Sequence, residues 1–326
     1  MPETEKIRVY YLASGDIGIP LLKALLKSER LELAGVASQL KQSKSAGPIR
    51  TSKSPVVEYC EDNGVAIQRF PSVNTEEFYD SFRKSGAELL IVASYGQILK
   101  QTLLDLPKFG CLNVHASLLP KYRGASPIVA ALLNGDAKTG ISFMRMEAGL
   151  DTGPIYRTVE LDIAPNDNAE TLEERLGTLA GQEIDSVVED ITRHGLQPVP
   201  QPESGSTYAK KICKEDSWVN WERSNIDIVN MLRAYTPWPN VRTLMPLRNG
   251  MTKMVKITEV EAKENGEPAA PGTILEAGRG GILVACGKGA LLIRRLTPEG
   301  KRNIDAGDYL LGFPLPNQSP CICGRQ

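Results

Sequence analysis

The chain has 326 residues, of which 41% are hydrophobic and 24% are charged, and its formal net charge is −1. This length predicts about two globular domains, and the near-neutral charge argues against a generally basic nucleic-acid-binding protein. The sequence has no apolar run of about 18 residues, so no transmembrane helix is expected.

Cysteine usage and the first residues predict where the protein works. The six cysteines fit neither a disulfide framework nor a zinc-binding pattern, and the polar residues 1–6 lack the apolar core of a signal peptide. We therefore expect a cytoplasmic protein with no metal site. We interpret Cys321 and Cys323 as incidental thiols of an exposed tail, with a metal site as the alternative.

Charge is distributed unequally along the chain. Residues 1–204 contain 21 Lys and Arg against 27 Asp and Glu, a balance of −6. Residues 205–326 contain 17 against 12, a balance of +5. Opposite signs in the two halves indicate a polyanionic partner for the basic half, with chance as the alternative.

Strands and helices alternate in the N-terminal part of the chain. A predicted strand at 6–12 leads through a turn with Gly15 and Gly18 into a helix that begins near Pro20. The turn does not match G-x-G-x-x-G, so dinucleotide binding is disfavoured. Further strands and helices are predicted at 31–38, 55–63, 65–69, 75–84 and 87–93. This alternation predicts an α/β fold with a doubly wound, mostly parallel sheet.

Residues 39–54 are polar and are predicted to form a long loop. No acidic residue occurs at 33–57. The loop carries four cations: Lys41, Lys44, Arg50 and Lys53. A solvated loop and a loop that contacts phosphates are both compatible with this composition.

Two polar side chains interrupt the apolar strand predicted to begin at Cys111. Strand residues alternate faces, so Asn113 and His115 point the same way. The loop at 117–124 follows at the carboxyl end of the strand, where open α/β sheets bind ligands. The strand before it delivers residues 94–99 to the same edge. The sequence therefore predicts a ligand pocket at this edge of the sheet.

The next elements complete the first domain. Helices are predicted at 128–134 and 168–194 and strands at 140–146 and 155–161. The loop between these two strands carries Asp151 between two glycines.

Proline and glycine follow the long helix and predict a linker. We place a first domain at 1–196, the linker at 197–209 and a second domain at 210–326. In the second domain, short apolar runs alternate with glycine turns, at 254–260, 272–276, 281–286 and 290–296. Such a pattern predicts a small β-barrel.

The chain contains two histidines. His194 lies at a predicted helix C-terminus, where a cation is favoured, so we interpret it as structural. A strand histidine such as His115 is more often a hydrogen-bonded core residue, but Asn113 and Asp151 are predicted to lie nearby. Two histidines are too few for a catalytic zinc site, and the G-x-S-x-G elbow of serine hydrolases is absent.

Asn, His and Asp without a nucleophile suit acyl transfer to an amine, because the amine is the substrate's own nucleophile. An Asn amide and a His N–H can donate to the oxyanion that develops on the former carbonyl oxygen. An Asp carboxylate beside the imidazole favours its protonated form and can relay a proton.

Residues 113–115, 117–127 and 149–153 resemble the signature of the folate-dependent formyltransferase family. Residues 94–99 resemble the folate-pocket loop of that family. In the C-terminal half, residues 207–212, 219–221 and 233–239 are similar to the branch of the family that acts on methionyl-tRNA. The resemblance therefore covers nearly the whole chain.

The resemblance implies an N-terminal Rossmann-like domain and a C-terminal OB-like barrel that contacts tRNA. It implies transfer of a formyl group from 10-formyltetrahydrofolate to the α-amino group of methionyl-initiator tRNA, for translation initiation. We expect a monomer. The catalytic residues carried over from the family are Asn113, His115 and Asp151.

Binding residues are also implied by the resemblance. The folate site is implied at Ser117, Leu118, Leu119, Pro120, Tyr95, Gly96, Gln97 and Ile98. Nucleic-acid contacts are implied at Lys41, Lys44, Arg50, Lys53 and Arg233. Residues 40–47 depart from the Asp-Arg-Pro-x-Gly-Arg pattern that is usual in the basic loop of the family.

Four other classes of protein are alternatives, which differ in the molecule that accepts the formyl group, lack catalysis or catalyse another reaction. A sugar-nucleotide N-formyltransferase would share the catalytic domain, but the Tyr-Thr-Pro-Trp-Pro stretch at 235–239 and the basic C-terminal half argue against it. An enzyme that formylates a free purine precursor would need no second domain. A non-catalytic RNA-binding protein would be expected to lack one of the three polar residues. A nicotinamide-dependent dehydrogenase would need a stronger glycine fingerprint.

Overall fold

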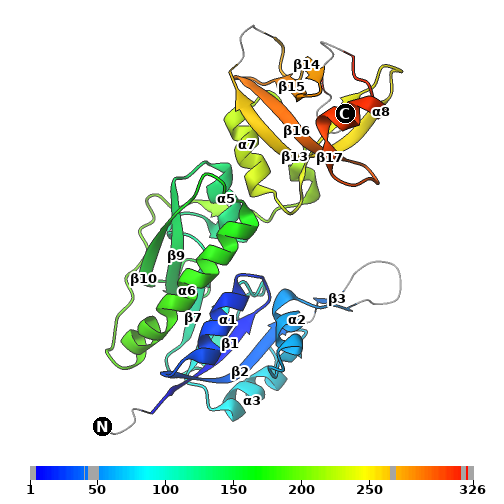
Figure 1. The fold of residues 1–326 in the computed structure, drawn as a ribbon. Coiled ribbons are helices and arrows are strands. Elements are labelled where there is room, and N and C mark those ends of the chain that lie inside the picture. The colour runs from blue at the N-terminus through cyan, green and yellow to red at the C-terminus, as the bar shows by residue number, and fades with distance from the viewer. Residues whose placement is uncertain (1–4, 40, 43–50, 265–268, 317–320, 322–326) are drawn as a thin grey trace. The chain divides into compact units, whose positions relative to one another are not determined.

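The chain forms two compact units. The computed structural model describes residues 5–39, 41–42, 51–264, 269–316 and 321 (Figure 1). The first unit comprises Met1–Ile128, Ala137–Ile163 and Thr171–Lys210, and the second comprises Val129–Asp136, Ala164–Glu170 and Lys211–Gln326. Residues 197–209, for which we predicted a linker, belong to the first unit in this division.

A seven-stranded sheet forms the centre of the first unit, in the order β10-β9-β7-β6-β1-β2-β5. Its strands are β1 Ile7–Ala13, β2 Leu31–Gln39, β5 Gln68–Phe70, β6 Leu89–Ala93, β7 Cys111–His115, β9 Lys138–Arg145 and β10 Ile155–Asp162. Strands β7 to β5 pair in parallel, and β9 and β10 add antiparallel at the β7 edge. The predicted mostly parallel sheet is confirmed; its antiparallel edge was not predicted.

Helices lie between these strands along the chain, and the longest of them follows β10. They are α1 Gly18–Lys27, α2 Pro55–Asp62, α3 Glu76–Ser85, α4 Gln101–Leu104, α5 Pro127–Leu133 and α6 Ala169–Thr192. The hydroxyls of Ser54 and Thr75 accept hydrogen bonds from the first turns of α2 and α3, and Gly86 ends α3 in the left-handed conformation. The helix boundaries follow these capping residues closely, which is why the sequence predicted them well.

Helices cover both faces of the parallel part of the sheet, as the side chains of β1 show. Tyr10 packs on Phe78 and Phe82 of α3, with ring centroids 5.6 and 5.7 Å apart. Tyr11 points to the opposite face, where its hydroxyl donates to the carbonyl of Gly18 in α1 at 3.0 Å. All five residues of β6 are buried, as expected for a strand between two layers of helices.

Helix α6 approaches α1 closely, and the two lie side by side in Figure 1. A Cβ at Gly177 would lie 2.9 Å from the carbonyl oxygen of Ile17, and one at Gly181 would lie 3.0 Å from Cβ of Ala24. A carboxylate oxygen of Glu173 also accepts from the Ile17 N–H at 3.1 Å. Glycine therefore sets the distance between these helices.

The second unit is built on an antiparallel sheet, in the order β12-β13-β16-β15-β14 with β17 paired to β16. Its elements are η1 Lys214–Ser217, α7 Asn225–Ala234, β12 Val241–Pro246, β13 Thr252–Lys263, β14 Ile274–Gly278, β15 Gly281–Ala285, β16 Ala290–Pro298, β17 Ile304–Asp305 and α8 Ala306–Gly312. The indole N–H of the buried Trp221 donates to Thr243 Oγ1 at 3.3 Å. This antiparallel half-barrel is OB-like, as predicted.

The shortest strands were not predicted from the sequence. Two-residue strands β8 Arg123–Gly124 and β11 Tyr208–Ala209 pair in parallel. Within the predicted loop at 39–54, β3 Lys41–Gln42 pairs with β4 Thr51–Ser52. A strand of two residues contains a single period of the alternation, which does not repeat, so hydrophobic patterning cannot reveal it.

The interpretation of Cys321 as an exposed thiol is wrong. The residue is buried, its N–H donates to the carbonyl of Gly272, and its sulfur lies 3.8 Å from Met245 Sδ. A cysteine behaves as a small apolar side chain, so it is stabilised against the buried methionine of β12 despite its position near the chain end. Cys323 lies outside the described residues.

We predict that Gly177→Leu destabilises the protein by about 1–3 kcal/mol, because the side chain has to displace the backbone at Ile17. Urea unfolding followed by circular dichroism measures the change. Glu174→Leu is the matched control, because Glu174 is exposed on the same helix. Equal midpoints for the two variants would show that the close contact between the helices does not limit stability.

Candidate active site

Strand β7 presents two polar side chains at its carboxyl end. Asn113 and His115 are 9% and 6% exposed, and Val114 between them is buried on the other face. Buried polar groups need partners, and both side chains face one carboxylate. That carboxylate belongs to Asp151 and is the hydrogen-bond acceptor of Asn113.

Asp151 lies in the loop between β9 and β10. Its Oδ1 accepts from Asn113 Nδ2 at 3.3 Å, and its Oδ2 accepts from the Gly124 N–H at 2.8 Å. His115 Nδ1 lies 3.7 Å from the same Oδ2. One carboxylate thus joins the end of β7, the loop after it and the β9–β10 loop.

The route of the chain to Asp151 is indirect. Because β9 runs antiparallel to β7, it ends beside the start of β7, where the Met146 N–H donates to the Cys111 carbonyl at 2.8 Å. The loop then has to return along β7 to bring Asp151 to His115. Asp151 adopts a left-handed backbone conformation with φ +54°, which Asp tolerates better than most residues.

The second ring nitrogen of His115 fixes its tautomer. Nε2 lies 2.9 Å from the carbonyl oxygen of Tyr122. A carbonyl oxygen only accepts, so Nε2 carries the hydrogen and donates it. In a neutral imidazole, Nδ1 then holds a lone pair on the side of Asp151, which suits it to accept a proton. The N–H that we expected to reach an oxyanion is already committed to Tyr122.

The loop after β7 is held by hydroxyl groups. Ser117 Oγ donates to the Lys121 carbonyl at 2.6 Å, and Ser142 Oγ donates to the Ser117 carbonyl at 2.7 Å. Ser142 Oγ also accepts from the Leu119 N–H at 3.0 Å. Ser117 and Leu119 are buried, whereas the side chains of Leu118 and Pro120 are partly exposed.

Residues 95–98 differ in what they present to solvent. The Tyr95 side chain lies in the aromatic core, where burial raises the pKa of its hydroxyl. Gln97 ties the loop to residues 71–73: its Nε2 donates to the Pro71 carbonyl at 2.9 Å, and its Oε1 accepts from the Val73 N–H at 3.3 Å. Gly96 is exposed, and Ile98 is 79% exposed. The accessible apolar surface of this loop is therefore Ile98.

A cysteine nucleophile is disfavoured at the start of β7. Burial raises the pKa of the Cys111 thiol to about 12, so it stays protonated at neutral pH. Among the described residues, His, Cys, Asp and Glu form no group of three or more that could hold a metal ion. The geometry suits proton transfer and hydrogen bonding to a substrate that brings its own nucleophile.

Sequence analysis missed a second set of contacts. The Tyr122 N–H donates to Thr207 Oγ1 at 2.8 Å, and the Arg123 N–H donates to the Thr207 carbonyl at 2.8 Å. Gln201 donates to the backbone of the loop that carries Asp151. The resemblance at 207–212 was interpreted as similarity to the branch of the family that acts on methionyl-tRNA, and no sequence signal distinguished Gln201 from the prolines around it.

The predicted nucleic-acid residues have different surroundings. Lys53 forms an ion pair with Glu61, whose hydrogen bond raises the pKa of the lysine. Arg233 donates to the carbonyls of Asp167 and Ala164, both at 2.8 Å. Only the backbone of Lys41 is described, and Lys44 and Arg50 lie outside the described residues.

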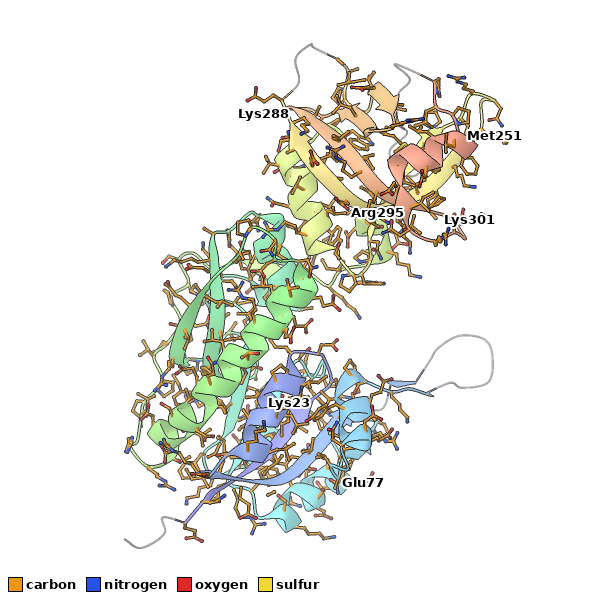
Figure 2. The ribbon with its side chains drawn as sticks, viewed as in Figure 1. Lys23, Glu77, Met251, Lys288, Arg295 and Lys301 are labelled. Carbon is orange, nitrogen blue, oxygen red and sulfur yellow. The ribbon has the colours of Figure 1, made fainter. Side chains whose placement is uncertain are left out.

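The second unit has cations that sequence analysis did not single out. Figure 2 marks Lys288, Arg295 and Lys301 on this unit. Lys288 and Lys301 are exposed, whereas Arg295 Nη1 donates to Asp305 Oδ1 at 2.8 Å. The net positive charge of this half thus includes side chains that are accessible to an anionic partner.

Comparison with protein families gives the class of the protein. Residues 6–188 match the family model described as formyl transferase, and residues 211–314 match the one described as formyl transferase, C-terminal domain. The site described above lies within the first match, except for Gln201 and Thr207. The two matches define a formyl transferase enzyme.

Individual relatives show to which formyl transferase family the chain belongs. A methionyl-tRNA formyltransferase of Geobacter sulfurreducens is 36% identical over 309 residues, which cover 95% of each chain. The chain belongs to the methionyl-tRNA formyltransferase family.

Solved structures support the fold. HypX from Aquifex aeolicus in complex with tetrahydrofolic acid gives a TM-score of 0.62 at 14% identity, over 94% of this chain and 47% of that one. An N-formyltransferase from Helicobacter canadensis, in complex with folinic acid and dTDP-3-aminofucose, gives 0.61 at 18% identity, over 88% and 98%. None of the helices in the described part of the chain has the length and apolarity needed to span a membrane.

We predict that Gly124→Ala slows formyl transfer by about 100-fold, the effect expected of a shift of about 1 Å in a catalytic group. Gly124 has φ +112°, and an added Cβ would lie 2.7 Å from the Ala209 carbonyl oxygen, so the N–H that binds Asp151 has to move. Steady-state assays measure the rate. Gly110→Ala is the control, because Gly110 also has positive φ but no atom within 4 Å of an added Cβ. Equal rates in the two variants would contradict the prediction.

Proposed function

We propose that this protein transfers the formyl group of 10-formyltetrahydrofolate to the α-amino group of methionyl-initiator tRNA, and acts as a monomer in cytoplasmic translation initiation. The observation that carries the proposal is the convergence of Asn113 and His115 on the Asp151 carboxylate. It occurs in a chain that is similar to a methionyl-tRNA formyltransferase along almost its whole length. The proposal assigns the catalytic roles to these three residues.

The amine of the acceptor attacks the formyl carbon, and a negative charge develops on the formyl oxygen. Asn113 Nδ2 has two hydrogens, of which one goes to Asp151 Oδ1. The second makes no hydrogen bond within the described residues, and we assign it to the oxyanion. Loss of one such donor costs about 100- to 1,000-fold in rate.

A proton has to move from the amine to N10 of the folate as the C–N10 bond breaks. His115 Nδ1 is suited to accept it, because Nε2–H is held by the Tyr122 carbonyl. The Asp151 carboxylate then stabilises the imidazolium until the proton passes to N10. The products are the formylated amine and tetrahydrofolate, so bonds and protons balance.

The folate ring is assigned to apolar surface on two loops. Leu118 and Pro120 are partly exposed after β7, and Ile98 is exposed after β6. Ser117, Leu119 and Tyr95 are buried and shape these loops from below. Gly96 and Gln97 complete the assigned set, Gln97 by holding residues 95–98 against residues 71–73.

The tRNA is assigned to the basic residues. Four cations at 41–53 and the positive C-terminal half would lie along phosphates. Lys53 has to give up part of its interaction with Glu61 for this role. Arg233 has three of its five N–H donors committed to Asp167, Ala164 and Asn230, so its contact with RNA is limited to the remaining two.

We predict that His115→Ala lowers kcat for formyl transfer from 10-formyltetrahydrofolate to methionyl-tRNA by at least about 100-fold, the contribution expected of a general base. Binding of methionyl-tRNA should change little. His194→Ala is the matched control, because His194 is the other histidine and is exposed just after the end of α6, beside Asp190. The assay includes a sugar-nucleotide amine as competing acceptor. Wild-type turnover by His115→Ala, or preference for the sugar amine, would refute the proposed function.

We predict that replacing Lys41, Lys44, Arg50 and Lys53 together with Ser weakens tRNA binding and flattens its salt dependence. Each lost phosphate contact should reduce the slope of log affinity against log salt by about 0.7–0.9. Filter binding at several salt concentrations measures the slope. Replacement of Lys6, Lys27, Lys84 and Lys100, which are exposed elsewhere on the first unit, removes the same charge. Equal slopes for the two variants would exclude the loop as a specific contact.

A further inference from the structure

Gln201 connects the segment after α6 to the loop that carries Asp151. Its Nε2 donates one hydrogen bond to the Asp151 carbonyl at 2.9 Å and another to the Gly153 carbonyl at 2.7 Å. Its Oε1 accepts from Arg123 Nε at 3.1 Å. We propose that Gln201 is a positioning residue for formyl transfer, which fixes Asp151 through the backbone of its loop. This inference rests on the proposed catalytic role of Asp151.

Arg123 determines which way the Gln201 amide points. An arginine only donates, so its Nε–H requires the oxygen of the amide and leaves the nitrogen for the two carbonyls. A reversed amide would place its oxygen against both carbonyls and its N–H groups against the guanidinium. Arg123 itself is held by β8, where its N–H donates to the Thr207 carbonyl at 2.8 Å.

Burial of Arg123 is not explained by stability. The side chain is 2% exposed, and its nearest carboxylate, on the exposed Glu203, lies 4.0 Å from Nη1. Nη2 is buried and finds no hydrogen-bond partner among the described residues. A buried cation with an unsatisfied donor is destabilising unless another interaction compensates. Its well-formed side-chain contact is the one to Gln201, which is the contact a positioning role requires.

The Asp151 loop needs such a restraint. Asp151 has φ +54°, Gly149 and Gly153 flank it, and the side chain of Leu150 is 56% exposed. A loop of this kind has few buried contacts of its own, so alternative conformations lie close in energy. Gln201 binds the carbonyls on both sides of Thr152 and so fixes the turn that aims the carboxylate. The carboxylate itself is then free to interact with Asn113, His115 and Gly124.

The segment that carries Gln201 is anchored on both sides. Val199 and Ile155 exchange two backbone hydrogen bonds of 2.8 Å, and Tyr208 and Ala209 form β11 beside β8. Gln201 is therefore presented from a fixed backbone rather than from a loose connection. The anchoring contacts of Val199 are made by the backbone, and those of Thr207 are made by its own backbone and hydroxyl, so none of them involves the Gln201 side chain.

Two substitutions separate positioning from packing. Gln201→Met keeps the length and removes all three hydrogen bonds. Gln201→Glu keeps the shape and the acceptor for Arg123 but replaces the donors to both carbonyls with a carboxylate oxygen. We expect both to lower kcat by about 100-fold, as for a displacement of about 1 Å, with KM for each substrate within about threefold of wild type. Gln197→Met is the control, because Gln197 is exposed four residues earlier.

A double-mutant cycle with Asp151→Asn gives the decisive result. If Gln201 acts through the Asp151 carboxylate, Gln201→Met lowers kcat in the wild-type background but causes no further loss in the Asp151→Asn background. Urea unfolding checks that each variant is folded. Multiplicative losses, or wild-type kcat in Gln201→Glu, would overturn the proposal. Wild-type kcat in Asp151→Asn alone would overturn the proposed site and this inference together, whereas a slow Asp151→Asn with a fast Gln201→Met would overturn only the inference.

Discussion

The Asp151 carboxylate is the group on which the arrangement of the site depends. It accepts hydrogen bonds from Asn113 and the Gly124 N–H and lies beside His115 Nδ1. A largely buried carboxylate of this kind is stabilised by the donors around it, and each donor comes from a different part of the chain. The carboxylate therefore couples the end of β7, the loop after it and the β9–β10 loop into one structure.

The two ring nitrogens of His115 have different surroundings, and this difference determines which nitrogen is available to accept a proton. A backbone carbonyl holds the hydrogen on Nε2, while Nδ1 faces the carboxylate. A proton taken from an amine would arrive on the nitrogen nearest a negative charge. In the proposed mechanism, the protein supplies a proton acceptor and a stabilising charge and leaves the nucleophile to the substrate, which is consistent with a formyl transferase.

The sequence allowed the first half of this site to be predicted because strand geometry is regular. Asn113 and His115 are two residues apart, and a period of two places them on one face whatever the rest of the fold does. Asp151 was harder, because β9 runs antiparallel and the loop has to return before it reaches His115. From the sequence, the Asp151 loop was expected near His115 without the return path that brings it there, and the resemblance supplied only the catalytic role of Asp151.

Other features depend on contacts that leave no periodic signal. Gln201 stands among prolines in a stretch with the composition of a linker, yet its amide contacts three residues distant in sequence. Cys321 sits near the chain end but is buried against Met245. In both cases tertiary packing decides the environment, and local composition carries no information about it. The folate and tRNA contacts stay predictions, since the partners that would define them are separate molecules.

The pairing of β8 with β11 affects where domains could be exchanged between members of this enzyme family. The region matched by the N-terminal family model ends at residue 188, but Thr207 and Gln201 lie beyond it and support Tyr122 and Asp151. The end of the family match, at residue 188, and the end of β11, at Ala209, thus differ by 21 residues. A chain recombined at residue 188 would keep every strand of the seven-stranded sheet and lose the residues that bind Tyr122 and the Asp151 loop. If Gln201 positions Asp151 as proposed, a functional exchange of the C-terminal domain has to retain the sequence through Ala209.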